Sequence, residues 1–374
     1  MIKTNSINPF TYNHLLMKKN IIFLLSLSIL GFSSCNNNDD DPQTLEYAVP
    51  TSYNFTPLNY ADATTIIAMH TELDAEMSKG KVANTVVSSS KLRSMYANTN
   101  SQFVSPTLNN SSLGMKEFTA VQGRSVVEIA MDSLGLASLS TVAASRGVAG
   151  VATDLTGTKF YLVSGRGIEY GQVVSKTLIG TLYYNQIVTH LSNTSLYLDN
   201  STVVSGQGTA LQHTWDLAFG FFGVPVTFPT VTTGAKYLGS YCNQVNAGIG
   251  SNNKLINAFL KGRAAIGAGD YATKDAQAAI IRTEAERVIA AAVIHELNSA
   301  KVNFADNAAR NHVVSEAMGF VNSLKLIDGS LTDTEADAIL ALFPYNLYDM
   351  SLTDINAVIN AIGAKYGFTN LSTI

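Results

Sequence analysis

Proline is absent from two long stretches of this chain, and this absence constrains the fold more than any other feature. No proline lies between Pro106 and Pro225, or between Pro229 and Pro344. Both stretches are rich in Ala, Leu, Ile and Val, and they lack the residue that most strongly disrupts a helix interior. Alternation of apolar and polar residues, which marks a half-buried strand, is nearly absent. We therefore predict an all-α fold, with one helical bundle or two packed together.

Apolar residues recur with the helical period along most of the chain. The predicted helices cover residues 60–79, 115–134, 167–192, 209–220, 235–246, 253–268, 272–299 and 308–325. Two more are expected near the C-terminus, where Thr-x-x-Glu and Ser-x-x-Asp sequences beginning at Thr332 and Ser351 match capping boxes. Residues 159–164 fit either a short strand or the start of a helix.

The N-terminal segment has the features of a secretory signal. Two lysines at 18–19 precede an apolar run at 21–32, which is too short to span a bilayer as a stable helix. The tetrapeptide Phe-Ser-Ser-Cys that ends at Cys35 resembles a bacterial lipobox, which implies a diacylglycerol group on the Cys35 sulfur and cleavage before that residue. An ordinary secreted protein with a chance cysteine is the alternative. Met17 is an alternative start of the chain.

An Asn- and Asp-rich run at 36–41 follows the predicted lipidated cysteine. Such a polar segment cannot bury surface and should act as a tether. It also resembles the acidic export signal of Bacteroidetes lipoproteins, which implies the outer membrane and its outer face; a plain linker is the alternative. We expect a signal peptide at 1–34, a lipidated acidic tether at 35–50, and a helical domain at 51–374.

Composition and missing motifs exclude several classes of function. With 24 basic and 28 acidic residues the net charge is −4, and no basic run lies beyond the N-terminal signal, so nucleic acid is not an expected partner. The chain has no phosphate-binding P-loop and no Gly-x-Ser-x-Gly nucleophile elbow. The sequence His295-Glu296-Leu297-Asn298-Ser299 lacks the second histidine of a zinc-protease helix. No catalytic residue is predicted.

The predicted helix 167–192 is apolar around most of its circumference and carries one narrow polar seam. Glu169, Gln172, Lys176 and Tyr183 fall on this seam when residues are placed at the angular spacing of an α-helix. The functional interpretation is a buried helix whose seam lines a hydrated cleft. The alternative is an ordinary solvent-facing edge.

His213 and Asp216 are one helical turn apart in the segment His213-Thr214-Trp215-Asp216. Their side chains point the same way, so they could ligate a cation jointly, or the carboxylate could orient the imidazole. Trp215, the single tryptophan of the chain, is a candidate for lining the same cleft. The alternative is a surface ion pair beside a core tryptophan.

Glu284 and His295 share one face of the predicted helix 272–299. Helical bundles place metal-binding carboxylates and histidines in this manner. Together with Glu169, His213 and Asp216 they form a candidate metal site, and this ligand set suits iron or zinc better than calcium. The alternative is a hydrogen-bonded structural network.

Several stretches resemble a family of uncharacterised Bacteroidetes lipoproteins, and the likeness covers nearly all of residues 50–370. The stretches are Gly167–Gln172, Tyr184–Ile187, His213–Gly220, Lys261–Ile266 and His295–Asn298. That family looks distantly related to the imelysin-like proteins, which implies paired helical bundles, a Gly-x-His-x-x-Glu signature and a link to iron uptake. Here Leu211 stands in the place of the glycine, and Asp216 in the place of the glutamate.

These observations favour a cell-envelope lipoprotein that acts as a non-catalytic binding protein, with a divalent metal ion or an iron complex as its ligand. A surface module that binds glycan or protein in a nutrient-uptake system is the first alternative. An imelysin-type metallopeptidase is the second. In each case the membrane is a partner through the lipid at Cys35.

Overall fold

The structure, a computed structural model, describes residues 46–374. The predicted signal segment, Cys35 and the acidic run lie outside the described residues. Within the described part the chain is mostly helical and contains only a two-stranded sheet, so the all-α prediction is confirmed. None of its helices is both long enough and apolar enough to cross a lipid bilayer.

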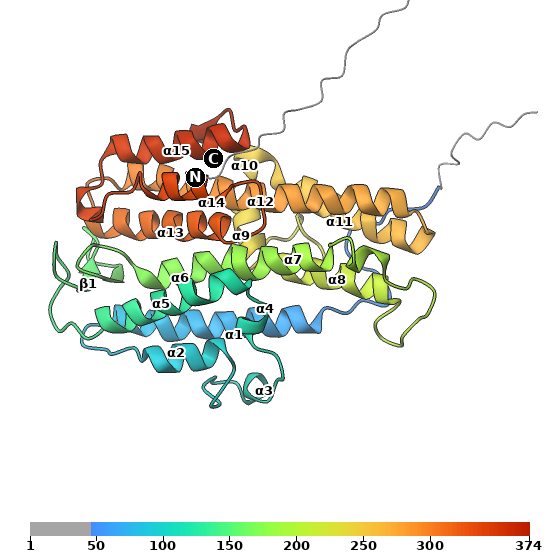
Figure 1. Cartoon of the computed structure of the whole chain (residues 1–374), viewed down its shortest axis with the longest axis horizontal. Helices are drawn as coiled ribbons and strands as arrows, with labels where there is room; N and C mark the ends of the chain where they lie inside the picture. Colours follow the sequence, from blue (N-terminus) through green and yellow to red (C-terminus); the bar gives the residue numbers. More distant parts are fainter. Residues whose placement is uncertain (1–45) are drawn as a thin grey trace, which may run out of the picture. The chain divides into compact units, whose positions relative to one another are not determined.

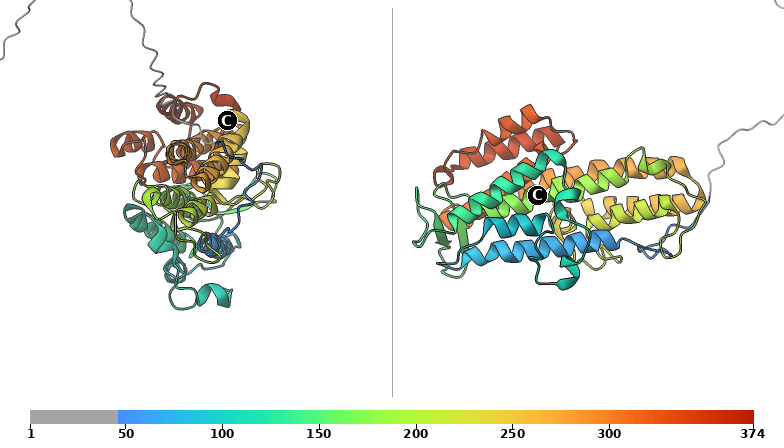
Figure 2. Two further views of the ribbon diagram at one scale, coloured as in Figure 1. Left: turned by 90° about the vertical axis from the view of Figure 1, so that its right-hand side faces the viewer. Right: turned by 60° about the horizontal axis from the view of Figure 1, so that its bottom comes forward.

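The long helices run side by side in stacked layers (Figures 1 and 2). The first half of the described chain contains α1 (Ala61–Ser78), η1 (Lys79–Lys81), α2 (Ser89–Tyr96), α3 (Pro106–Asn109), α4 (Met115–Phe118), α5 (Val121–Ala137), β1 (Gly150–Thr153), β2 (Phe160–Val163), α6 (Tyr170–Leu178), η2 (Ile179–Tyr184) and α7 (Asn185–His190). The second half contains η3 (Ser195–Tyr197), α8 (Ala210–Phe222), α9 (Tyr237–Gln244), α10 (Asn246–Ile249), α11 (Ser251–Ala268), α12 (Tyr271–Val302), α13 (Asn307–Lys325), α14 (Asp333–Leu340), η4 (Leu347–Asp349), α15 (Leu352–Tyr366) and η5 (Leu371–Thr373).

Helix α12 is surrounded by other helices and organises the C-terminal half of the domain. It packs against α11, α13 and α15 (Figure 1). The run Ala290–Ile294 is fully buried, and its three consecutive alanines let neighbouring helices approach closely on several sides. Asp270 begins the helix by accepting a hydrogen bond from the Thr273 backbone N–H.

Helix α6 joins the two halves, because it packs against α5 on one side and α13 on the other. The predicted continuous helix 167–192 is interrupted by the π-helical turn η2. At this turn the Gly180 N–H donates to Ser323 Oγ over 2.9 Å, and a Cβ on Gly180 would lie 2.6 Å from Ser323 Cβ. Helix α13 approaches closely at this turn, and the Ser323 hydroxyl enters the backbone hydrogen-bond pattern of the helix. This explains the interruption.

The helix ends follow the local chemistry that the sequence predicts. Thr332 and Ser351 both form complete capping boxes, which confirms the two predicted helix starts. Residues 159–164 contain strand β2, which pairs antiparallel with β1. Strand β1 and helix α2 were not expected, because β1 has only four residues and the serine-rich sequence of α2 carries little periodic signal.

Candidate functional site

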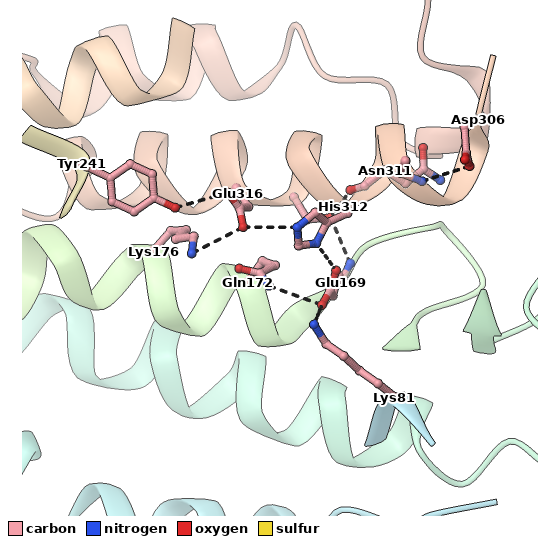
Figure 3. Close-up of polar contacts among 11 residues, drawn as sticks. Lys81, Glu169, Gln172, Lys176, Tyr241, Asp306, Asn311, His312 and Glu316 are labelled. Atoms are coloured by element: carbon pink, nitrogen blue, oxygen red, sulfur yellow. Dashed lines mark hydrogen bonds and ion pairs between the residues drawn. The ribbon is translucent and has the colours of Figure 1, made fainter. Parts of the chain in front are cut away.

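A polar pocket of about 230 Å³ lies between α1, η1, α5, β2 and α6. Its polar and charged lining comes from α1, η1 and α6, and its apolar lining comes from α1, α5 and β2. The lining residues are Asp74, Met77, Ser78, Lys81, Leu134, Leu162, Glu169, Gly171, Gln172, Ser175 and Lys176. The spacing of Glu169, Gln172 and Lys176 turns all three side chains toward one side of α6 (Figure 3). The predicted polar seam therefore borders a pocket over this part of its length.

A glycine turn positions the first of these residues. Gly167, between β2 and α6, has a φ of 77°, a left-handed conformation that favours glycine. A Cβ at this position would lie 2.4 Å from Asn311 Nδ2 on α13, so the turn also requires close packing. The Glu169 N–H then donates to Ser315 Oγ over 2.9 Å, which fixes the start of α6 against α13.

Glu169 is the centre of a buried ionic network (Figure 3). Only 2% of this residue is exposed, and its carboxylate lies 3.1 Å from Lys81 Nζ and 2.6 Å from His312 Nδ1. The Gln172 side-chain amide donates to the same carboxylate over 3.4 Å. Burial alone would raise the pKa of Glu169, but the bonds from His312 and Lys81 outweigh it and hold the pKa below its usual value.

A second buried carboxylate, Glu316, continues the network along α13. It lies 3.4 Å from Lys176 Nζ and 3.5 Å from His312 Nε2, and it accepts a hydrogen bond from the Tyr241 hydroxyl over 3.3 Å (Figure 3). Burial opposes the ammonium form of Lys176, yet the charge of Glu316 raises the Lys176 pKa above its usual value. Burial, followed by the charge of Glu316, raises the pKa of Glu296 well above its usual value, which favours the neutral form of Glu296.

Asp74 reaches the pocket from α1 and belongs to a third group of side chains. The Tyr237 hydroxyl donates to Asp74 Oδ2 over 3.2 Å, and His70 Nε2 lies 3.5 Å from Asp74 Oδ1. His70 is fully buried, pairs through Nδ1 with the Tyr183 hydroxyl over 3.0 Å, and stacks on the Tyr237 ring with centroids 4.0 Å apart. Burial lowers the pKa of His70, which favours the neutral form of this imidazole.

The predicted pair His213 and Asp216 does not form an open cation site. Asp216 is fully buried, and its Oδ1 accepts bonds of 2.8 Å from Arg263 Nε and from the Tyr53 hydroxyl. Arg263, on α11, therefore supplies the positive charge that a metal ion would have supplied. His213 is partly buried on α8, with no hydrogen-bond partner for Nδ1 among the described residues.

The other predicted ligands are also separated from one another. Glu284 lies 3.4 Å from Lys254 Nζ and 3.6 Å from Arg287 Nε, while His295 is half-buried beside the backbone at Ile374. Across residues 46–374, no three or more His, Cys, Asp or Glu side chains are grouped so that they could hold a metal ion. The structure does not bring Glu169, His213, Asp216, Glu284 and His295 together, and most of these side chains have protein partners of their own.

Two predicted lining residues lie away from the pocket. Trp215 is fully buried, and its indole N–H donates to the Phe259 carbonyl oxygen over 3.1 Å, so it is a core residue. Tyr183 is buried against His70 and does not line the pocket. Sequence reasoning missed the partners from other helices, although His70 with Asp74 and His312 with Glu316 are spaced four residues apart on their helices, a spacing that could have identified them.

Comparison with known proteins assigns the chain to a family. Residues 50–369 match the family described as a domain of unknown function, DUF4856, and the chain belongs to this family. No curated protein and no solved structure matches the chain.

Proposed function

We propose that this DUF4856 protein is a non-catalytic binding protein of the cell envelope, and that it holds a small polar solute in the pocket between α1, α5 and α6. The observation that carries the proposal is the preformed lining of this pocket. Glu169, nearly inaccessible to solvent, is held by three side chains from three different elements. Pre-ordered polar groups in a concave site lower the entropic cost of binding.

The protonation states in the pocket support binding rather than proton transfer. Lys176 is held as an ammonium by Glu316, and Glu169 is held as a carboxylate by Lys81 and His312. Groups whose charged forms are stabilised in this way have pKa values shifted away from neutral pH, and they make poor general acids or bases there. They are, in contrast, well suited to holding a ligand through fixed charges and hydrogen bonds.

The cellular setting of the proposal rests on the N-terminal sequence. A lipid at Cys35 would hold the domain at the membrane, and the acidic tether favours the outer membrane of a Bacteroidetes cell and its outer face. The relationship to imelysin-like proteins is part of the same proposal, supported by the helical bundles and the His-x-x-Asp sequence at His213. We propose an organic solute as the ligand, and not iron or zinc, because the carboxylate of Asp216, one of the expected metal ligands, is already paired with Arg263.

Ligand binding in the pocket can be tested by replacing a glycine of the lining with a larger residue whose side chain fills the pocket. A Cβ on Gly171 would lie 3.4 Å from Leu134 Cδ1 and 4.0 Å from Met77 Cβ, which is ordinary contact, so a Gly171→Leu side chain should extend into the pocket without disrupting α6. Gly267, on α11, has open space around it, and Gly267→Leu is the matched control.

The purified protein is screened by thermal shift and calorimetry against sugars, amino acids, amines, organic acids, iron and zinc. We expect a small organic ligand to stabilise the wild type and the Gly267→Leu variant but not Gly171→Leu. Ligand binding that survives in Gly171→Leu would reject this pocket. Stabilisation by iron or zinc alone, lost in His213→Ala, would instead support the metal hypothesis.

A further inference from the structure

We propose that the ligand of this pocket is a small organic ammonium compound, and that the Asp74 carboxylate receives its positively charged nitrogen. This inference rests on the proposed function and specifies the ligand class. It follows from how the charges that line the pocket are paired with one another and with the residues behind them.

Three of the four charged lining residues are already neutralised by protein partners. Lys81 Nζ and the Glu169 carboxylate lie 3.1 Å apart and neutralise each other. Lys176 Nζ lies 3.4 Å from Glu316 and 5.3 Å from the centre of the Tyr241 ring, and these contacts draw it toward α13 and α9. The charge of Asp74 also acts on Lys176, but less strongly than that of Glu316. Asp74 is different, because among the described residues no lysine or arginine nitrogen lies within 4 Å of it.

The groups in closest contact with the Asp74 carboxylate are neutral, and Lys176, whose charge acts on Asp74 from farther away, has Glu316 as its ion-pair partner. Tyr237 donates a hydrogen bond to one oxygen, and neutral His70 lies beside the other. His70 Nε2 is fully buried and has no hydrogen-bond partner in the described part of the chain, and Asp74 Oδ1 lies 3.5 Å from it.

The conformation of Tyr237 supports a positioning role. Its φ is 47°, in the left-handed region that is costly for a bulky aromatic residue. Backbone strain of this kind persists where surrounding contacts determine the geometry. Here the Tyr237 ring stacks on His70, and the Tyr237 hydroxyl donates a hydrogen bond to Asp74. The strained residue thus fixes the carboxylate that faces the pocket.

The remaining lining sets the size and character of the rest of the ligand. Met77, Leu134 and Leu162 provide an apolar wall, which suits a short carbon chain. Gln172 and Ser175 provide neutral hydrogen-bonding groups for a polar substituent. A volume of about 230 Å³ is small for a ligand pocket, and it fits a compact amine rather than an oligosaccharide or a peptide.

Three probes of equal size and different charge test the ligand class. Butylammonium, 1-butanol and butyrate are titrated into the wild-type protein, into Asp74→Asn and into Asp62→Asn, with binding measured by calorimetry. Asp62 is exposed on the same helix and is the matched control. Asn at position 74 can still accept the Tyr237 hydrogen bond, and a thermal melt checks that each variant is folded.

We expect butylammonium to bind the wild type and Asp62→Asn about tenfold or more tightly than the two other probes, because only it forms a charge-assisted bond. In Asp74→Asn this preference should fall to about twofold or less. Equal binding of butanol or butyrate to the wild type, abolished by Gly171→Leu, would overturn the ammonium class and leave the pocket proposal intact. Failure of butylammonium to bind, or an unchanged preference in Asp74→Asn, would also overturn it.

Discussion

Arg263 and Asp216 form a buried ion pair whose disruption has a predictable cost. Asp216 is 0% exposed and Arg263 is 3% exposed, and the guanidinium contacts both carboxylate oxygens, at 2.8 and 3.4 Å. Arg263→Met keeps much of the aliphatic volume and removes the charge, which leaves the carboxylate with Tyr53 as its remaining side-chain donor. Leaving a buried charge without its partner costs about 3–5 kcal/mol, a large fraction of a typical unfolding free energy of about 5–15 kcal/mol.

Urea denaturation followed by fluorescence measures this cost, and Trp215, the only tryptophan, lies next to Asp216 on α8. The double variant Asp216→Asn, Arg263→Met should regain about 2 kcal/mol of the loss, because the unpaired charge is gone. Burial raises the pKa of Asp216, while Arg263 opposes this effect. In Arg263→Met the pKa should rise further, so the destabilisation relative to wild type should shrink as the pH falls and Asp216 is protonated. Destabilisation below about 1 kcal/mol at pH 7, with no recovery in the double variant, would refute the reasoning.

Two other perturbations test the close packing at Gly262 and the protonation of the buried His190 imidazole. Gly262→Ala should destabilise the protein by about 1–3 kcal/mol in the same denaturation assay, because its Cβ would lie 2.0 Å from Trp215 Cζ2; Gly267→Ala, in open space on a helix, should not destabilise it. Burial, and then nearby His213, lowers the pKa of His190 from 6.5 to about 4. The unfolded state therefore binds more protons in this interval, and stability should fall as the pH decreases from about 6.5 to about 4. The His190→Gln variant should show a shallower loss across the same interval, and an unchanged slope would contradict the assignment.

The helices were predictable because their signals are local. Periodic apolar residues and capping boxes act within a few turns, so the starts of α14 and α15 at Thr332 and Ser351 could be identified without any tertiary information. The interruption at η2 could not, because its cause is a hydroxyl from Ser323, far along the chain on α13. Short elements such as β1 also escaped, since four residues carry too little periodicity.

Candidate site residues were harder to predict than helices, because the state of a polar side chain depends on what other helices bring to it. The seam of α6 was visible from spacing alone, and Glu169, Gln172 and Lys176 do line the pocket. The two partners of Glu169, which are Lys81 and His312, come from η1 and α13, which lie on either side of α6 in Figure 3. Spacing along one helix contains no information about such partners.

Two His–Asp pairs in this chain show that spacing along a helix cannot distinguish a neutralised carboxylate from one that is free to bind a ligand. His213 with Asp216 and His70 with Asp74 both place an imidazole and a carboxylate about one turn apart on a helix, so sequence alone gives them nearly equal claims to a ligand. In the folded domain Arg263 approaches Asp216 from α11 and neutralises it. No lysine or arginine nitrogen lies within 4 Å of Asp74 in the described part of the chain, and its close neighbours, His70 and Tyr237, are neutral. Because a fixed negative charge that faces a pocket attracts a positive ligand, the pair whose carboxylate has no lysine or arginine in direct contact is the better candidate for recognition.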